Sequence, residues 1–431
     1  YRRCVNDLNR ALLAASSGDA RISLSDYEDR SLSPLRSSDL REAADHPEDN
    51  PFYEYFSERL RGAMRDESPP FVGFSLTYLG QALTTFAMMG FVRAEYPSSK
   101  IILGGALVTS WMGNASRSVR FDGLVDHVVA GPGETFLLDL LGSEGERPIG
   151  ATYDYGPFPR NDYLAPGMIM PYSTSTGCYY GKCSFCPETA ERNAYYQVGP
   201  RRAAEEIGRL VRETDPALVH LVDNAISPAV LKELIRKPPG RPWYGFVRMT
   251  RELIDPHFCA QLKGSGCVML KIGVESGDEG VLNAMGKGIN IADMSQGLEA
   301  LSGAGIATYV YLLFGTPWES EASAGKTLDF VVGHAPCIDF LNLAVFNLPH
   351  YSPDAAGLEQ RPFYDGDLSF YTDFVHPAGW DRKKVRHFLD RVFIRHPAVR
   401  EIVKRQPPCF TSNHAAFFCI QGSFNRRPGR V

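Results

Sequence analysis

Six apolar segments alternate with helical segments between residues 169 and 346, and this alternation constrains the fold more than any other feature of the chain. Short apolar runs separated by helices are typical of parallel strands. Repeated strand–helix units of this kind close into a full or partial parallel barrel. The expected strands are 169–176, 218–223, 243–250, 268–275, 306–314 and 340–346, and the expected helices lie near 201–213, 229–235, 256–264, 294–302 and 322–333.

A shorter series of strands and helices precedes the barrel. Glycines stand at the ends of its expected strands, where a backbone turns or approaches a ligand closely. This pattern predicts a Rossmann-like half domain. Its strands are expected at 71–77, 100–105 and 127–134 and its helices at 5–15, 52–65, 81–96 and 135–141; a loop is expected at 23–48 and a linker at 142–166.

The 431 residues are expected to form three parts, because about 100–200 residues make up a typical domain. Residues 1–150 form the Rossmann-like domain in this interpretation, and residues 151–346 form the barrel. Residues 347–431 form a C-terminal α-rich cap with one amphipathic helix at 381–393, which we expect to pack across the barrel mouth and to select the substrate.

Charge and cysteine usage exclude several classes of protein. The net charge of −5 comes from 45 basic and 50 acidic residues without long blocks, so we expect neither a nucleic-acid nor a membrane partner. No long apolar run or signal-peptide pattern occurs, and we expect a cytoplasmic location. Nine cysteines, an odd number and mostly isolated, do not form a secreted disulfide framework.

Three of the nine cysteines, Cys178, Cys183 and Cys186, lie within nine residues directly after the first barrel strand. Thiolates bind zinc or iron–sulfur clusters, and a structural zinc site needs a fourth ligand. The nearest downstream candidates are His220 and Cys259, and neither has the paired spacing of a zinc ribbon. Three thiolates on a four-iron cluster leave one iron open. We therefore favour a cluster over structural zinc or inert thiols.

Several motifs around this loop occur in order and resemble those of the radical S-adenosylmethionine (radical SAM) superfamily. The resemblance covers about residues 165 to 346. It is carried by the cysteine loop, Leu-Val-Asp-Asn at 221–224, Met-Leu-Lys-Ile-Gly-Val-Glu-Ser-Gly at 269–277, Val-Leu-Asn-Ala-Met-Gly-Lys at 281–287, Gly-Ala-Gly-Ile at 303–306 and Leu-Phe-Gly-Thr-Pro-Trp-Glu at 313–319.

The resemblance implies a partial (β/α)6 TIM-like barrel that holds a 4Fe-4S cluster, whose open iron binds S-adenosyl-L-methionine. Glu275, between Gly273 and Gly277, is then expected to accept hydrogen bonds from the ribose hydroxyls. Arg248 and Asp223 are candidates for contacting the methionine carboxylate or the substrate, with an ordinary rim salt bridge as the alternative. The implied cluster ligands are Cys178, Cys183 and Cys186, and the implied cofactor-binding residues are Phe185, Gly273, Glu275 and Ser276.

The cysteine spacing departs from the family pattern. Four residues separate Cys178 from Cys183, whereas the family usually has three. Gly181 can absorb the extra residue as a bulge. The change bears on the geometry at the open iron, and hence on which carbon–sulfur bond is cut.

The amino-terminal half resembles the cobalamin-binding domain that precedes the barrel in one large subgroup of the family. This resemblance implies that Ser75, Gly104, Gly105 and Gly133 line the cobalamin. No Asp-x-His-x-x-Gly motif is present, so a histidine of that type does not ligate cobalt from below. A Rossmann-like domain that has lost its ligand remains the alternative.

The C-terminal region contributes one further candidate, Cys409, in a Pro-Cys-Phe-Thr-Ser-Asn-His run. A thiol there suits a soft electrophile or a metalloid substrate. Buried cysteines more often behave as small hydrophobic residues, and that interpretation stays open.

The favoured function is a radical SAM transferase that moves a methyl group, through cobalamin, to a small-molecule substrate. A reducing partner such as flavodoxin or ferredoxin would supply the electron. One alternative is transfer of the 3-amino-3-carboxypropyl group of S-adenosyl-L-methionine to a nucleophile or a metalloid such as arsenic(III). Another is a non-catalytic cobalamin or iron–sulfur binding module.

Overall fold

The computed structural model divides the chain into two compact units. The amino-terminal unit comprises residues 1–148, 349–351 and 360–373, and the barrel unit comprises 149–348, 352–359 and 374–431. The region expected as a separate C-terminal part therefore contributes to both units. The residues described are 2–16, 20–64, 69–113, 121–142, 153–158, 162–350, 352–363 and 365–420, so most of the expected linker at 142–166 lies outside them.

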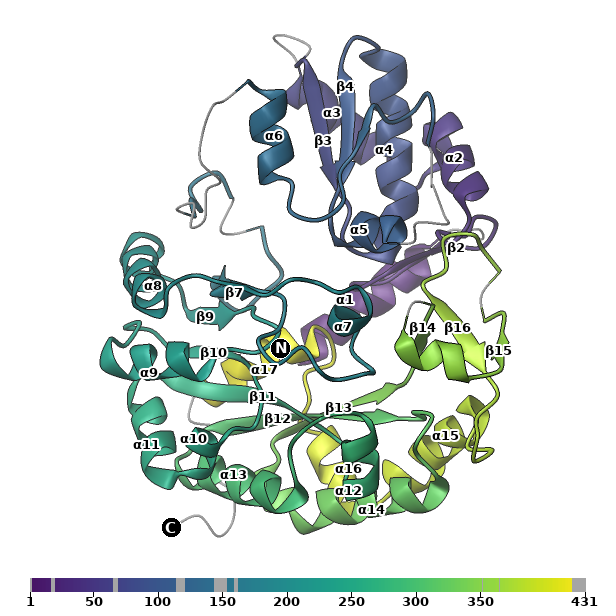
Figure 1. The fold of residues 1–431 in the computed structure, drawn as a ribbon. Helices are drawn as coiled ribbons and strands as arrows, with labels where there is room; N and C mark the ends of the chain where they lie inside the picture. Colours follow the sequence, from purple (N-terminus) through teal and green to yellow (C-terminus); the bar gives the residue numbers. More distant parts are fainter. Residues whose placement is uncertain are drawn as a thin grey trace. The chain divides into compact units, whose positions relative to one another are not determined.

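The barrel unit is built on a six-stranded parallel sheet with strand order β13-β12-β11-β10-β9-β6 (Figure 1). Each strand pairs with the next barrel strand along the chain, as in a partial (β/α)6 barrel, and the expected fold class is confirmed. The strands are β6 (Ile169–Tyr172), β9 (Leu218–Leu221), β10 (Trp243–Val247), β11 (Cys267–Glu275), β12 (Ala307–Phe314) and β13 (Phe340–Val345).

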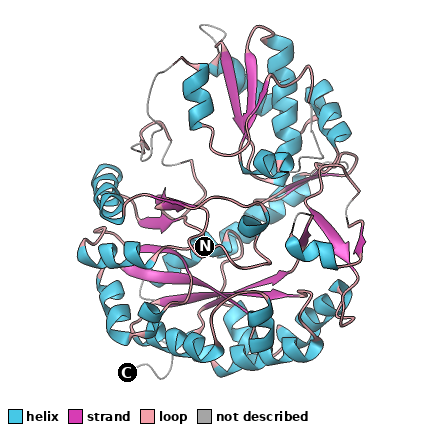
Figure 2. Ribbon diagram, viewed as in Figure 1, coloured by secondary structure: helices cyan, strands magenta, loops and turns pink. Residues whose placement is uncertain are grey.

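Helices cover the outer face of this sheet (Figure 2). Leu270, Ile272 and Val274 alternate along β11 and pack into one core with helix residues such as Leu298. Asn290 caps α13 by accepting a hydrogen bond from the amide of Asp293. The covering helices are α8 (Pro200–Thr214), α9 (Pro228–Arg236), α10 (Arg251–Ile254), α11 (Pro256–Gly264), α12 (Glu279–Ala284), α13 (Ile291–Gly303), α14 (Glu321–Gly333), α15 (Arg382–Phe388) with a π-helical turn at Leu389–Phe393, and α16 (Pro397–Val403).

The intervening residues of β11, which include Met269, Lys271 and Gly273, face the inside of the barrel. Helix α17 (Thr411–Ile420) closes the amino ends of the strands, because its Ala415, Ala416 and Phe417 pack with residues that begin the strands, such as Leu218 and Met269. This part of the C-terminal region therefore does not cross the barrel mouth as expected. Its small side chains let the helix lie close to the sheet.

The amino-terminal unit contains a three-stranded parallel sheet, β3 (Phe71–Ser75), β4 (Lys100–Gly104) and β5 (His127–Val128), in that order. Its core includes Phe86 and Met89 from α4 and Leu103 from β4. The other elements of the unit are α1 (Arg2–Ala15), β1 (Ala20–Ile22), β2 (Tyr27–Asp29), α2 (Ser37–Asp45), α3 (Tyr53–Ala63), α4 (Ala82–Glu95), α5 (Ala106–Met112), α6 (Glu134–Leu140), β15 (Gln360–Arg361) and most of β16 (Tyr371–Phe374).

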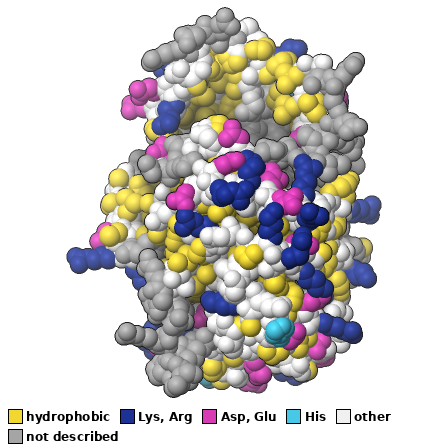
Figure 3. All heavy atoms as spheres, turned by 90° about the vertical axis from the view of Figure 1, so that its left-hand side faces the viewer, with side chains coloured by type: hydrophobic (Ala, Val, Ile, Leu, Met, Phe, Trp, Pro, Cys, Tyr) yellow, Lys and Arg dark blue, Asp and Glu magenta, His cyan; other side chains and the backbone are white. Residues whose placement is uncertain are grey.

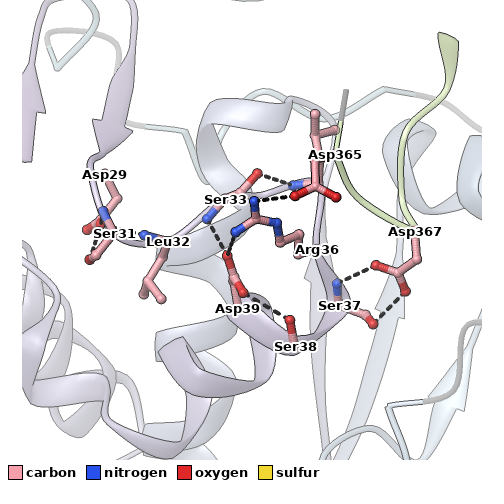
Figure 4. Close-up of polar contacts among 11 residues, drawn as sticks. Asp29, Ser31, Leu32, Ser33, Arg36, Ser37, Ser38, Asp39, Asp365 and Asp367 are labelled. Carbon is pink, nitrogen blue, oxygen red and sulfur yellow. Dashed lines mark hydrogen bonds and ion pairs between the residues drawn. The ribbon is translucent and has the colours of Figure 1, made fainter. Parts of the chain in front are cut away.

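Helix α2 lies in the stretch expected to be a loop, and that expectation was wrong. Asp367, far away in the sequence, accepts hydrogen bonds from the Ser37 amide at 2.8 Å and hydroxyl at 2.6 Å (Figure 4). Arg36 donates to Asp365 at 2.7 Å in the same network. Close packing holds the other end, because a Cβ on Gly90 of α4 would overlap the Ala44 carbonyl. The helix is therefore stabilised by tertiary contacts rather than by its own sequence.

The outer surface shown in Figure 3 carries basic and acidic side chains side by side. Along α8, Arg201 pairs with Glu205 at 3.3 Å and Arg209 pairs with Glu213 at 2.5 Å. None of the helices in the described ranges is long and apolar enough to span a membrane.

Candidate functional site

The cysteine loop follows β7 (Ser175–Thr176), which pairs antiparallel with β8 (Tyr196–Gln197) near the carboxyl end of β6. Gly177 opens the loop with a positive φ of 71°, and a Cβ there would lie 2.6 Å from the Ala194 carbonyl oxygen. Gly181 has a φ of 58°, a backbone conformation that glycine adopts readily. Cys186 directly precedes the short helix α7 (Pro187–Ala190). All three cysteines of the loop are half-buried and free.

A glycine-rich segment after α12 anchors the loop. The Tyr180 hydroxyl donates to the Gly286 carbonyl at 2.9 Å, and the Ser184 amide donates to the Met285 carbonyl at 3.0 Å. Gly286 and Gly288 both have positive φ, and a Cβ on Gly288 would overlap the Tyr180 hydroxyl. The Met-Gly-Lys-Gly sequence thus fits beneath the loop because its glycines have no side chains.

Arg248 lies against the same loop. Its guanidinium carbon is 3.3 Å from the centre of the Tyr180 ring, a close cation–π contact. One guanidinium nitrogen lies 3.9 Å from Cys183 Sγ, and another donates to the Lys287 carbonyl. The arginine predicted as a site residue therefore faces the cysteines.

Burial makes two of the loop thiols, those of Cys183 and Cys186, poor acids. It raises the pKa of Cys186 to about 11 and also raises the pKa of Cys183. Nearby Lys287 and Arg248 oppose the rise in the pKa of Cys183. Cys183 and Cys186 therefore favour the protonated thiol until a metal centre replaces the proton.

Glu275 ends β11 in a strained conformation. Its φ is 64°, unusual for a residue with a side chain, and the pairing of β11 with β12 shifts register between Gly273 and Glu275. Its carboxylate accepts a hydrogen bond from Lys287 Nζ at 2.7 Å, and the two side chains are 11% and 8% exposed. A Cβ on Gly273 would overlap Glu275 Oε1, so the glycine makes room for the pair. Such strain is concentrated at functional sites.

Two other predicted cofactor residues differ in their surroundings. The Phe185 ring lies 5.5 Å from Lys287 Nζ and packs with Phe346. Ser276 is fully buried, and its hydroxyl lies 3.3 Å from the Thr327 hydroxyl of α14. Phe185 therefore joins the Glu275–Lys287 pair to the cysteine loop, whereas Ser276 holds a strand end to a helix.

Asp223 does not pair with Arg248, so the rim salt bridge considered above was wrong. Its carboxylate accepts hydrogen bonds from the Thr174 amide at 3.1 Å, the Thr174 hydroxyl at 2.6 Å and the Ser175 hydroxyl at 2.6 Å. The residue is only 3% exposed. Asp223 therefore fixes the backbone that leads into the cysteine loop.

Cys409 lies just before α17, the helix that packs at the amino ends of the strands. In the described ranges no hydrogen bond or ion pair joins it to the cysteine loop. Its role toward substrate stays a prediction.

The predicted glycine site of the amino-terminal unit lies at the carboxyl edge of its sheet. Ser75 ends β3 and pairs in register with Gly104, which ends β4. Gly105 has a φ of 107°, and a Cβ there would overlap the Leu76 carbonyl. Gly133 precedes α6, and among the described residues a Cβ there would meet only Val129, at 3.8 Å. Gly105 is thus needed by the fold, while Gly133 leaves open space beside the edge.

The sequence interpretation gave no role to Lys287, although it lies in the motif at 281–287. It also gave none to Glu319 in the motif at 313–319. Glu319 is 1% exposed and accepts from the Gly315 amide at 2.5 Å and from Trp380 Nε1 at 2.9 Å. Burial raises its pKa to about 7. Each of these residues is the last residue of its motif, and a charged residue at that position was the signal in the sequence that could have identified it.

In the part of the chain that the structure describes, no three His, Cys, Asp or Glu side chains are close enough together to hold one metal ion.

Comparisons with known proteins agree with this architecture. Residues 172–331 match the family model of the radical SAM superfamily. An anaerobic magnesium-protoporphyrin IX monomethyl ester cyclase from Rubrivivax gelatinosus is 22% identical over 249 residues, which are 53% of this chain. The match spans 44% of the cyclase, less than half of its length.

Solved structures share the fold. The radical S-adenosylmethionine methyltransferase TsrM from Kitasatospora setae, with tryptophan and a SAM analogue bound, has a TM-score of 0.55 at 18% identity, covering 77% of this chain and 76% of TsrM. A second TsrM structure, with cobalamin and a [4Fe-4S] cluster bound, has a TM-score of 0.54 at 18% identity, covering 78% and 75%. The part of the chain that matches the family model, residues 172–331, includes the cysteine loop, Glu275 and Lys287.

Proposed function

We propose that this chain is a radical SAM transferase whose cysteine loop binds a 4Fe-4S cluster and whose strand ends bind S-adenosyl-L-methionine. The observation that carries the proposal is a series of contacts that runs from Cys183 through Arg248 to Lys287. Lys287 in turn contacts both the Phe185 ring and the strained Glu275. The three loop cysteines are the proposed ligands. A cluster and S-adenosyl-L-methionine would together supply the electron transfer and the carbon–sulfur bond cleavage.

The donor set fits a cluster better than zinc. Zinc holds its thiolates about 2.3 Å from one centre, which requires them to converge. A cluster attaches each cysteine to a different iron and tolerates wider spacing. The loop presents three free thiols, and no three possible ligands among the described residues are grouped to hold one metal ion. The Arg248 guanidinium beside Cys183 would partly offset the negative charge of cluster thiolates.

The Glu275–Lys287 pair is the proposed site for the polar part of S-adenosyl-L-methionine. The Glu275 carboxylate is preorganised, since its backbone strain and the Lys287 ammonium both fix its position. Its second oxygen can accept a hydrogen bond from a ribose hydroxyl. Phe185 would present an apolar ring beside an adenine, and Gly273 makes room for the Glu275–Lys287 pair.

Methyl transfer through cobalamin is the reaction we favour. TsrM, which shares the fold, is named a methyltransferase, and one of its structures contains cobalamin. The carboxyl edge of the β3-β4-β5 sheet, with Ser75, Gly104 and Gly133, is the proposed cobalamin site in this chain. We propose a small-molecule substrate, with flavodoxin or ferredoxin as reductant. Nine free cysteines fit a reducing compartment such as the cytoplasm.

The test is anaerobic cluster reconstitution followed by reduction with S-adenosyl-L-methionine and mass spectrometry of the nucleoside products, with and without cobalamin. Deoxyadenosine, together with S-adenosylhomocysteine when cobalamin is present, would support methyl transfer. Methylthioadenosine would instead favour aminocarboxypropyl transfer. Bound cobalamin or cluster without any cleavage of S-adenosyl-L-methionine would favour the binding module.

Cluster ligation is tested separately by Cys183→Ala, which should remove most of the bound iron. Cys337→Ala is the matched control, because Cys337 is also half-buried but lies in the distant turn after α14. Equal iron content in both variants would refute the assignment of the loop.

A further inference from the structure

A buried lysine lies inside the barrel, and it has no acidic partner among the described residues. Lys271 is 6% exposed, and it precedes Gly273 by one inward-facing position on β11. Its Nζ is 3.0 Å from His220 Nε2 of β9 and 5.1 Å from the centre of the Tyr244 ring of β10. The imidazole stacks on that ring at 4.3 Å with an angle of 5°. Three neighbouring strands therefore fix the position of the amine.

The described surroundings of Lys271 supply no negative charge. Across the residues that the structure describes, no carboxylate lies within ion-pair distance of Nζ, in contrast to Lys287 with Glu275. Burial and the Lys271 charge lower the pKa of His220 to about 3, so this ring is neutral. Burial raises the pKa of Tyr244, Tyr309 and Tyr311, so these hydroxyls are also neutral. Lys271 is thus the titrating group of this cluster near neutral pH.

An ammonium has three N–H donors, and His220 can accept one of them. Burying a cation without a counter-ion is costly, and burial lowers the pKa of Lys271 to about 8. A bound anion would accept the remaining donors and offset that cost. One lysine matches a monoanion such as a carboxylate better than a phosphate dianion, which would call for further cations.

We propose that Lys271 binds the carboxylate of an aromatic or otherwise planar substrate inside the barrel. This deepens the proposed function, on which it rests, by naming the substrate class. The Phe246 and Tyr311 rings, 5.0 Å apart, line the same inner face and suit a flat apolar body. Because two strand residues span roughly 7 Å, a substrate held at Lys271 would extend toward Gly273 and the Glu275–Lys287 pair.

The experiment compares benzoate with benzamide as probes of the cluster-reconstituted full chain, using ligand-observed NMR to measure affinity. The two probes have similar shapes and differ in charge. Wild-type protein should bind benzoate about tenfold or more tightly than benzamide, and Lys271→Met should lose that preference. Lys383→Met, which removes an exposed lysine of α15, should keep it. Wild-type affinity for benzoate should fall as the pH rises through about 8, because Lys271 loses its proton while benzoate stays charged.

Equal affinity of the wild-type protein for the two probes, or unchanged benzoate binding by Lys271→Met, would overturn the proposal. If that variant does not fold, the pH dependence of the wild-type protein and a Lys271→Arg variant that keeps the charge decide the question. Iron content and S-adenosyl-L-methionine binding are measured on the same samples. Their absence from wild-type protein would count against the proposed function, whereas a wild-type protein that keeps both but shows no preference for benzoate over benzamide counts against the lysine site alone.

Discussion

Replacing Lys287 with methionine should strongly destabilise the barrel unit. The lysine ammonium lies 2.7 Å from the Glu275 carboxylate, and both side chains are about nine-tenths buried. Methionine fills a similar volume but leaves the carboxylate buried without a cation. Removing one partner of a buried ion pair typically costs about 3–5 kcal/mol in the free energy of unfolding. We expect a loss in that range.

If the loss of stability comes from the unpaired Glu275 carboxylate, then replacing Glu275 as well should restore part of the free energy of unfolding. In Glu275→Gln/Lys287→Met no unpaired charge remains, so the double variant should be more stable than Lys287→Met alone. Lys326→Met is the control, because Lys326 also pairs with a carboxylate, Asp278, at 2.8 Å but has a side chain that is 63% exposed. We expect that exposed pair to contribute no more than about 1 kcal/mol.

The assay is anaerobic urea denaturation of cluster-free protein, followed by tryptophan fluorescence. Three of the four tryptophans, Trp243, Trp318 and Trp380, belong to the barrel unit, so the signal reports mainly on that unit. A loss below about 1 kcal/mol for Lys287→Met would refute the reasoning, because a buried carboxylate cannot lose its cation at so small a cost. A double variant as unstable as the single one would also refute it.

Three further predictions concern the loop, the buried glutamate and α2. Gly288→Ala should displace Tyr180 and lower the iron content after reconstitution, measured against wild type; full iron content would contradict the proposed anchoring. Burial raises the pKa of Glu319 from 4.5 in the unfolded chain to about 7 in the folded protein. Between these two pH values the folded protein keeps a proton that the unfolded chain has lost. The stability of the wild-type protein therefore falls as the pH rises from 4.5 to about 7. At 1.36 kcal/mol per pKa unit the fall is about 3 kcal/mol, and Glu319→Gln should remove it; parallel urea-stability curves at pH 5 to 8 would argue against this. Asp367→Ala should destabilise the amino-terminal unit by about 1 kcal/mol through loss of the α2 cap, measured by hydrogen exchange of α2 amides, and unchanged exchange would exclude a capping role.

The barrel was predictable because its strands carry local signals. In β11 every residue from Cys267 to Glu275 is buried, and the sequence shows this as an apolar run bounded by glycines. The cysteine loop was equally visible, since its three ligands are close in sequence. Periodicity and motif spacing are properties of short segments, so they can be recognised in a single amino-acid sequence.

Contacts between distant segments could not be predicted in this way. The α2 region has a polar, acidic sequence, and the Asp367 cap and the Gly90 contact that stabilise the helix come from elsewhere in the chain. Asp223 was expected at the barrel rim beside Arg248, but its carboxylate instead accepts hydrogen bonds from Thr174 and Ser175. Sequence spacing places a residue at a strand end but does not choose between the partners that meet there.

The Asp367 contact also bears on the order in which the protein is completed during synthesis. The ribosome produces the first 148 residues and then the whole six-stranded sheet before residues 360–373 emerge. Until then the first amides of α2 lack their carboxylate, and the Leu368 side chain is missing from the core of the amino-terminal unit. The amino-terminal unit therefore reaches its final structure only after the six-stranded sheet has been made, so a chain stopped after β13 would carry an unfinished amino-terminal unit.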